Sequence, residues 1–276
     1  MSDELPRSRQ ARLAAEQALV RVVHHYGERP EFVVLGGLVP ELLCSSSAHR
    51  HAGTTDIDVQ VNLEIECDAA NTVRLERALR NAEFEPDSAQ IWRWRIRSED
   101  VHAEVKFELF ADMDDVANET TIRFAGCERL GAVNLRGTRY ATRDIESRTL
   151  TAKVGEDLRT VDINVTGVAG FLLAKCAAAY SRRKPKDWYD IAFVLLHNDL
   201  GGPTQAAQAI VERFGDGAIK ASKTALAELS ANFSDPQAQG PVAYADQLLV
   251  DHPDYEPAQA KADAIAAVAE FCDALV

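Results

Sequence analysis

The chain has 276 residues, of which 46% are hydrophobic and 26% are charged, values typical of a soluble globular protein with one or two domains. Its net charge of -13 and pI near 5.0 argue against broad electrostatic binding to nucleic acid, although they allow a local basic groove. The N-terminus has no hydrophobic signal region, no run of about 18 apolar residues occurs, and five widely spaced cysteines favour reduced thiols. We therefore expect a cytoplasmic protein without a membrane segment, disulfide framework or zinc site.

The first third of the chain alternates helices and short strands. Residues 8–26 predict an amphipathic helix, with Leu13 on its apolar face. EFVVLGG (31–37) predicts a short buried strand that ends at two glycines. LVPELLC (38–44) begins a helix, because proline is tolerated in a first helical turn. SSSAHRHAG (45–53) is a polar loop.

The next segments continue the mixed pattern, and the last third is helical. Strands are predicted at TDIDVQVNL (55–63), IWRWRIR (91–97) and VHAEVKFELF (101–110), a helix at 68–84, and strands with turns from 120 to 165. After about residue 166 every segment has helical character. This order predicts an α+β fold, with an α+β domain over residues 1–165 and a helical domain over residues 166–276.

Two aspartates lie on one face of the predicted strand 55–63. Asp56 and Asp58 point the same way because strand residues alternate, and their side chains begin about 7 Å apart. Their charges repel unless a cation lies between them, and oxygen ligands favour a hard ion such as Mg²⁺. Such a pair is more commonly explained by acidic side chains on a solvent-exposed face of a strand. The apolar Val59 and Val61 on one side and Ile57 on the other favour instead a strand buried on much of both faces, where unpaired charge is costly.

Two further features suit a phosphate-bearing substrate. Gly36-Gly37 follows a strand and precedes a helix, so its backbone N–H groups could approach a phosphate, although simple turn chemistry explains the pair as well. A two-metal arrangement needs a third carboxylate. Glu104 and Glu108, on the polar face of strand 101–110, are the candidates.

The helical half carries one charged motif. Lys175 lies among apolar neighbours and either reaches the surface or points into a cleft. The turn SRRKPKD (181–187) is the densest basic cluster in an acidic chain, and most such turns are only charged connections. Asp187 can cap the following helix and shares a helix face with Asp190. If RNA binds, this turn is the first candidate, and the arginines of residues 91–97 are the second.

The combined pattern resembles the nucleotidyltransferase superfamily typified by DNA polymerase β. The resemblance is carried by VVLGGLVPELL (33–43), GTTDIDVQV (53–61) and VKFELF (105–110). LLAKCAAAYSRRKPKDWYDIAFVL (172–195) is similar to a segment of the AbiEii/AbiGii-type toxin nucleotidyltransferases. The resemblance covers roughly residues 30–200.

The resemblance implies a mixed-sheet nucleotidyltransferase domain followed by a helical domain. It implies transfer of a nucleotide from an NTP to an acceptor with release of pyrophosphate. The metal ligands for Mg²⁺ would be Asp56, Asp58 and Glu108, which would act in catalysis together with Lys175 and Asp187. The nucleotide would be bound by Gly36, Gly37, Thr55, Lys175 and Lys186.

The resemblance also implies the toxin of a toxin–antitoxin or abortive-infection system. The acceptor would be RNA, with tRNA the first candidate, and a cognate antitoxin protein would be a partner. Nucleotidylation of a protein side chain is an alternative that the low pI slightly favours. A catalytically inactive nucleotide-binding protein is another, although such a protein has little reason to keep two repelling aspartates.

Overall fold

The computed structural model describes residues 9–61, 69–98 and 103–275, and the chain divides into two compact units. The first comprises Met1–Val39 and Gly53–Thr166, and the second comprises Pro40–Ala52 and Gly167–Val276. A mixed sheet in the first unit and helices in the second confirm the predicted α+β class. The sequence did not indicate that Pro40–Ala52 belongs with the C-terminal helices.

The first unit contains the sheet. Its elements are α1 (Arg9–Tyr26), β1 (Val33–Leu35), η1 (Gly36–Leu38), β2 (Asp56–Gln60), α4 (Ala69–Asn81), β3 (Glu85–Pro86), β4 (Arg93–Ser98), β5 (Ala103–Ala111), β6 (Thr121–Arg123), β7 (Gly131–Asn134), η2 (Ala141–Arg143), β8 (Ile145–Val154) and β9 (Asp157–Thr166). Residues 8, 62, 63, 68, 101 and 102 of the predicted elements lie outside the described residues. Leu13 is 55% exposed, so its predicted place on the apolar face of α1 is wrong.

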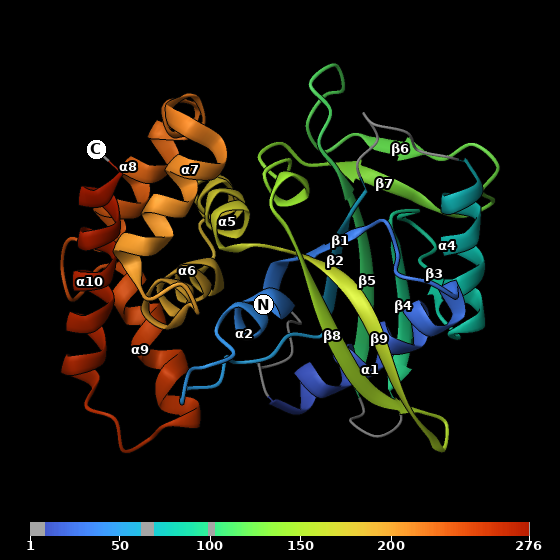
Figure 1. Ribbon diagram of the computed structural model, residues 1–276, viewed down its shortest axis with the longest axis horizontal. Helices are drawn as coiled ribbons and strands as arrows, with labels where there is room; N and C mark the ends of the chain where they lie inside the picture. The colour runs from blue at the N-terminus through green and yellow to red at the C-terminus, as the bar shows by residue number, and fades with distance from the viewer. Residues whose placement is uncertain (1–8, 62–68, 99–102, 276) are drawn as a thin grey trace. The chain divides into compact units, whose positions relative to one another are not determined.

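The sheet places β2 between the strands that carry the other predicted site residues. The strand order is β3-β4-β5-β2-β1-β9-β8, and β7 pairs with both β5 and β6 (Figure 1). Strand β2 runs antiparallel to β1 and parallel to β5. The glycine turn after β1 and the acids of β5 are therefore both neighbours of β2.

One face of β2 is apolar and the other is polar. Ile57 and Val59 are fully buried, together with Phe107 of β5, which packs edge-on against Phe32 at a ring-centroid distance of 5.8 Å. Asp56 and Asp58 alternate with them and are only half-buried. The expectation that β2 is buried by apolar residues on much of both faces is therefore wrong. Ile57 and Val59 share one face because they are two residues apart.

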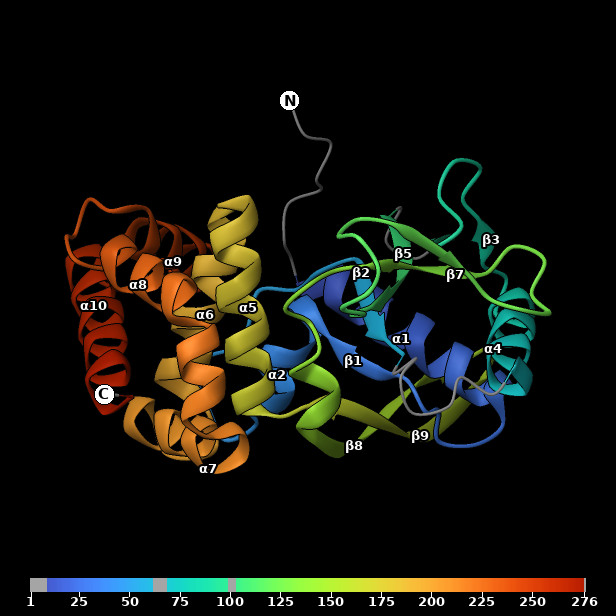
Figure 2. The ribbon, with the colours of Figure 1, turned by 90° about the horizontal axis from the view of Figure 1, so that it is seen from above.

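The second unit is helical. Its helices are α5 (Val168–Arg182), α6 (Pro185–His197), α7 (Pro203–Ala221), α8 (Lys223–Asn232), α9 (Gln239–Asp251) and α10 (Pro257–Ala274), and α2 (Val39–Leu43) begins at the last residue of the first unit's N-terminal segment. Helix α6 packs against α5, α9 and α10 (Figures 1 and 2). Trp188, Phe193, Phe233 and Phe271 are fully buried within this unit.

Residues 40–52 are anchored to the C-terminal helices by polar contacts. The Asp199 carboxylate accepts hydrogen bonds from the backbone N–H and the hydroxyl of Ser45, at 3.0 and 2.7 Å, and from the same groups of Ser46, at 2.9 and 2.6 Å. His49 packs against His197 and His252, with ring centroids 5.1 and 4.8 Å apart. Residues 45–52 of the predicted polar loop are therefore part of the helical unit, whereas Gly53 belongs to the first unit.

Two expectations from the sequence concern membrane segments and disulfide bonds. In the part of the chain that the structure describes, no helix is long and apolar enough to cross a membrane. Cys44, Cys127, Cys176 and Cys272 are free thiols there, and Cys67 lies outside the described residues.

Candidate active site

The glycine turn is built against the aspartates of β2. Gly36 has a φ of +75°, and a Cβ atom at this position would lie 1.9 Å from Asp58 Oδ2. A Cβ on Gly37 would lie 3.0 Å from the methyl carbon of Thr54. The first glycine is required both by its left-handed backbone and by the closeness of the Asp58 carboxylate. The turn after β1 thus holds its backbone directly beside the Asp-x-Asp pair.

The backbone around Asp56 is also fixed by short-range hydrogen bonds. Its N–H donates to Thr54 Oγ1 at 3.1 Å, and Thr54 is buried. Thr55, predicted to bind the nucleotide, lies one residue before β2, and its carbonyl accepts the Lys106 N–H at 3.0 Å. This threonine is therefore placed at the N-terminal end of β2, next to Asp56.

The third predicted acid lies beside the pair. The parallel register of β2 and β5 pairs Asp58 with Glu108 and Asp56 with Lys106. Because paired residues in neighbouring strands share a face, all four side chains lie on the polar face of the sheet. Glu104 lies two residues before Lys106, outside this register, and its carboxylate is 3.5 Å from Arg95. The geometry therefore places Glu108, and not Glu104, next to Asp58.

Basic residues alternate with these acids. Arg93 of β4 pairs with Glu108 in register, and its Nε lies 2.6 Å from Glu108 Oε1. Lys106 Nζ lies 3.6 Å from Asp56 Oδ1. Burial raises the pKa of Glu108 above its ordinary value, with Arg93 opposing and Asp56 reinforcing the rise. Acidic and basic side chains therefore alternate on this polar face, and these ion pairs were not predicted from the sequence.

The fit of a metal ion is partial. In residues 9–61, 69–98 and 103–275, no group of three or more His, Cys, Asp or Glu side chains is arranged to hold one. However, Asp56 Oδ1 is buried and makes no hydrogen bond with the described residues. A pair of neighbouring carboxylates, one of which has such an oxygen, suits Mg²⁺, because this ion completes its coordination with water and phosphate. Asp56 and Asp58 fit the ion as a pair, whereas the Glu108 carboxylate is bound by Arg93.

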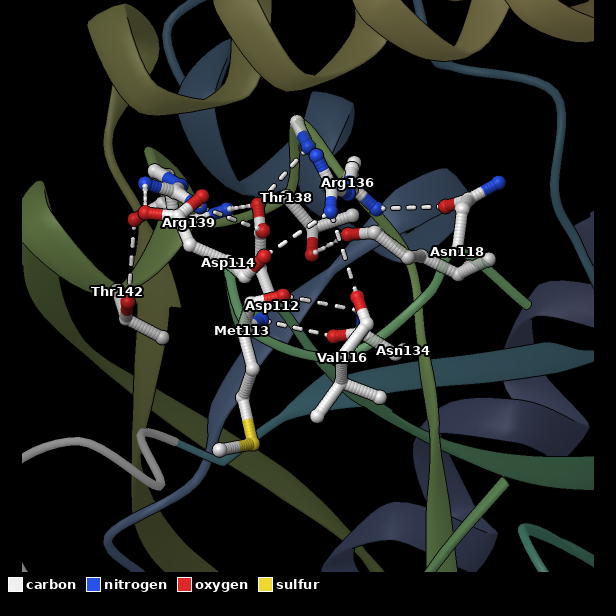
Figure 3. Close-up of polar contacts among 12 residues, drawn as sticks. Asp112, Met113, Asp114, Val116, Asn118, Asn134, Arg136, Thr138, Arg139 and Thr142 are labelled. Atoms are coloured by element: carbon white, nitrogen blue, oxygen red, sulfur yellow. Dashed lines mark hydrogen bonds and ion pairs between the residues drawn. The ribbon is translucent and has the colours of Figure 1, made fainter. Parts of the chain in front are cut away.

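A second Asp-x-Asp pair follows β5 and has a structural role. Figure 3 shows Asp112 and Asp114 beside Arg139, whose guanidinium bonds both carboxylates. Asp112 also accepts the backbone N–H groups of Gly137 and Arg139, at 2.8 and 2.9 Å. Asn134, fully buried, accepts the Met113 N–H at 2.7 Å. These contacts tie the loop after β5 to the chain around residues 134–139, so this pair is charge-compensated without a metal.

The predicted residues of the helical unit form a buried ionic network. Lys175 Nζ lies 3.1 Å from Asp187 Oδ1 and 2.7 Å from Asp190 Oδ2. Arg182 adds two hydrogen bonds of 2.6 Å to the Asp187 carboxylate. Lys175 is 6% exposed, and both aspartates are fully buried. The prediction that Asp187 caps α6 is wrong, because Lys184 is the N-cap residue and no side chain caps the helix.

Electrostatics keep this network charged. Burial acts to lower the Lys175 pKa, but Asp190 and Asp187 outweigh it and hold the pKa above its ordinary value. Burial acts to raise the Asp187 pKa, but Lys175 and Arg182 bring it below its ordinary value. The favoured state is therefore an ammonium shared between two carboxylates. Lys186, in the first turn of α6, is only half-buried.

The network includes a histidine that the sequence analysis did not single out. His51 Nε2 lies 2.9 Å from Asp190 Oδ1, with both side chains fully buried. The His51 ring stacks on Tyr189 at a centroid distance of 4.9 Å, and the Tyr189 hydroxyl accepts the Ala52 N–H at 2.9 Å. No local sequence signal marks His51, because its partners are about 140 residues away.

The arrangement in the first unit defines a class of protein. A strand and glycine turn lie against an Asp-x-Asp strand, which is flanked on its other side by a strand carrying a third acid. This is the arrangement expected of a nucleotidyltransferase. The family model described as the nucleotidyl transferase AbiEii toxin of type IV toxin–antitoxin systems matches residues 17–268. The chain belongs to this family, which confirms the resemblance.

Two further comparisons gave no relatives. Neither the curated proteins nor the solved structures include a match to this chain. The family assignment therefore stands on the family model, which spans nearly the whole chain.

Proposed function

We propose that the protein is a Mg²⁺-dependent toxin nucleotidyltransferase that transfers a nucleotide from an NTP to RNA, with tRNA the first candidate, and releases pyrophosphate. The supporting observation is the pair Asp56 and Asp58, held against the glycine turn in a chain of the AbiEii family. The same family description supports a cognate antitoxin as a partner.

In this proposal the first unit binds the reacting phosphates. Asp56 and Asp58 hold Mg²⁺, which when bound neutralises charge on the phosphoryl oxygens. Glu108 is the third acid, and the contact of its Oε1 with Arg93 would compete with its binding of the cation. Gly36 and Gly37 offer backbone N–H groups to the triphosphate. Thr55, at the N-terminal end of β2, is proposed to bind the nucleotide as well. Catalysis then consists mainly of positioning and electrostatic stabilisation.

The helical unit supplies basic groups. Lys175 and Lys186 are proposed to contact the triphosphate, and Asp187 to orient them. The observed ion pairs support this orienting role for Lys175, because the Asp187 carboxylate binds both Lys175 and Arg182. Lys186 is more exposed than Lys175 and is therefore the better candidate for a direct phosphate contact.

The test is a labelling experiment. The purified protein is incubated with Mg²⁺, each of four NTPs labelled at the α-phosphate, and total cellular RNA. We expect label in RNA of tRNA size and stoichiometric pyrophosphate. The double variant Asp56→Asn/Asp58→Asn should lose both, because it keeps the side-chain shape and removes the charges that would hold the cation.

A matched control and the alternative outcomes complete the test. Asp157→Asn/Asp235→Asn removes two exposed carboxylates elsewhere and should label RNA normally. Label on protein, lost in the Asp56/Asp58 variant, would replace RNA by a protein side chain as acceptor. The protein would also be tested with host RNA as the acceptor and, separately, with the antitoxin protein as the acceptor. NTP binding without label on either acceptor would contradict the proposed transfer.

A further inference from the structure

The charge partner of Asp56 lies on the neighbouring strand. Asp56 and Lys106 are paired in the parallel register of β2 and β5, and their side chains project from the same face. The ammonium lies 3.6 Å from Asp56 Oδ1. Both side chains keep some contact with solvent, with exposed fractions of 28% for Lys106 and 21% for Asp56. This ion pair therefore lies at the edge of the candidate metal site.

The contact leaves the carboxylate oxygen unsatisfied. Asp56 Oδ1 is buried and makes no hydrogen bond with the described residues, so Lys106 neutralises it by charge and does not bond it. A buried carboxylate oxygen without a hydrogen bond is costly unless a ligand completes it. The geometry is that of an oxygen kept available for another positive group.

The other acid on this face is held differently. The Glu108 carboxylate receives a charge-assisted hydrogen bond of 2.6 Å from Arg93, whose guanidinium also lies 4.6 Å from the centre of the Trp92 ring. An arginine that is both bonded and stacked is fixed in place. Lysine instead carries a compact charge on a flexible stem and makes the looser contact. Of the two basic partners, Lys106 is therefore the exchangeable one.

We propose that Lys106 is an exchangeable charge partner: its ammonium compensates Asp56 in the absence of a divalent cation and turns to the nucleotide's triphosphate once Asp56 binds the cation. This inference rests on the proposed function. It assigns Lys106 a role as a ligand of the nucleotide and couples nucleotide binding to metal binding. The same side chain then opposes the metal ion and favours the nucleotide.

Metal binding without nucleotide gives the first test. Mn²⁺ is titrated into the metal-free protein, and the free ion is measured from its electron paramagnetic resonance signal. Removing the competing ammonium in Lys106→Met should tighten Mn²⁺ binding about threefold, the effect expected for one partly exposed charge. Lys106→Arg retains the charge and should not tighten it.

Nucleotide binding gives the second test. A fluorescent NTP analogue that cannot be cleaved at the α-phosphate is titrated in the presence of saturating Mn²⁺. Lys106→Met should bind it about threefold to tenfold more weakly, because one charged phosphate contact is lost. Opposite effects on the ion and the nucleotide are the signature of the proposal. A role in stability alone would weaken both or leave both unchanged, and either result would overturn it.

Two controls separate this inference from the proposed function. Lys153→Met removes an exposed lysine from the same unit and should change neither affinity. Asp56→Asn/Asp58→Asn should abolish Mn²⁺ binding at this site. If it does and Lys106→Met still fails to tighten Mn²⁺ binding, only the role of Lys106 is wrong. If the aspartate variant binds Mn²⁺ like the unmodified protein, the proposed metal site itself is wrong.

Discussion

At the scale of single residues, Gly36 is the position where backbone conformation and site chemistry depend on each other. An alanine there would adopt a left-handed backbone at a cost of about 1–3 kcal/mol. Its Cβ would also lie where the Asp58 carboxylate now is, 1.9 Å from Oδ2. We expect Gly36→Ala to lower the free energy of unfolding, measured in urea, and to weaken Mn²⁺ binding by displacing Asp58.

A second glycine separates these two effects. Gly155 also has a positive φ, +63°, but nothing lies within 4 Å of the place where its Cβ would stand. Gly155→Ala should therefore show the backbone cost alone and bind Mn²⁺ normally. If both alanine variants bound Mn²⁺ equally well, the close approach of the glycine turn to Asp58 would have no role in the site.

The residue scale also shows what the sequence can predict about the site. Alternation along β2 and β5 correctly placed Asp56 with Asp58 and Lys106 with Glu108, because strand periodicity is a local property. The ion pairs were not predictable, because they depend on which strands pair and in which register. Arg93 meets Glu108 only because β4 and β5 are antiparallel with that register.

At the scale of elements, α5 and α6 are joined by the network around Lys175. Its ammonium is the shared partner of Asp187 and Asp190, which are fully buried. Lys175→Met would leave buried carboxylates with fewer positive partners, so we expect a loss of about 3–5 kcal/mol in the free energy of unfolding. The control Lys153→Met, at an exposed position, should change it by less than about 0.5 kcal/mol.

A double variant distinguishes stability from nucleotide binding. Lys175→Met/Asp190→Asn removes a positive and a negative charge together, so it should recover part of the stability lost in Lys175→Met. The Asp190→Asn change also alters the buried contact of Asp190 with His51, which makes the recovery incomplete. An unchanged unfolding curve for Lys175→Met, combined with weaker NTP binding, would instead assign Lys175 to the nucleotide alone.

Elements differ in how well the sequence predicts them. Helices such as α5 and α6 were predicted because the helical character of the segments after about residue 166 is visible locally. The membership of Pro40–Ala52 in the helical unit was not, because its anchors, Asp199, His197 and His252, lie far along the chain. The same distance hid the contact between His51 and Asp190.

At the scale of the whole molecule, the net charge of -13 repels a polyanion, so any RNA binding has to be local. The turn between α5 and α6 offers such a place. Arg182 is held by Asp187, and Arg183 lies 3.4 Å from Glu228. Lys184 is exposed and Lys186 is half-buried in the same turn, so these two lysines are the ones we test as phosphate contacts. RNA binding through this turn should weaken steeply as salt is added, because phosphate contacts release counterions.

The salt dependence counts these contacts. If both lysines bind phosphates of single-stranded RNA, Lys184→Ala/Lys186→Ala should lower the slope of log K against log salt by about 1.4. Lys220→Ala/Lys223→Ala removes the same charge from exposed positions of the same unit, so it reproduces the change in net charge without the contacts. Because counterion release depends on contacts and net charge acts at long range, only the first variant should change the slope. Equal slopes for the two variants would place the RNA-binding surface elsewhere, with Arg95 and Arg97 of β4 the next positions to substitute.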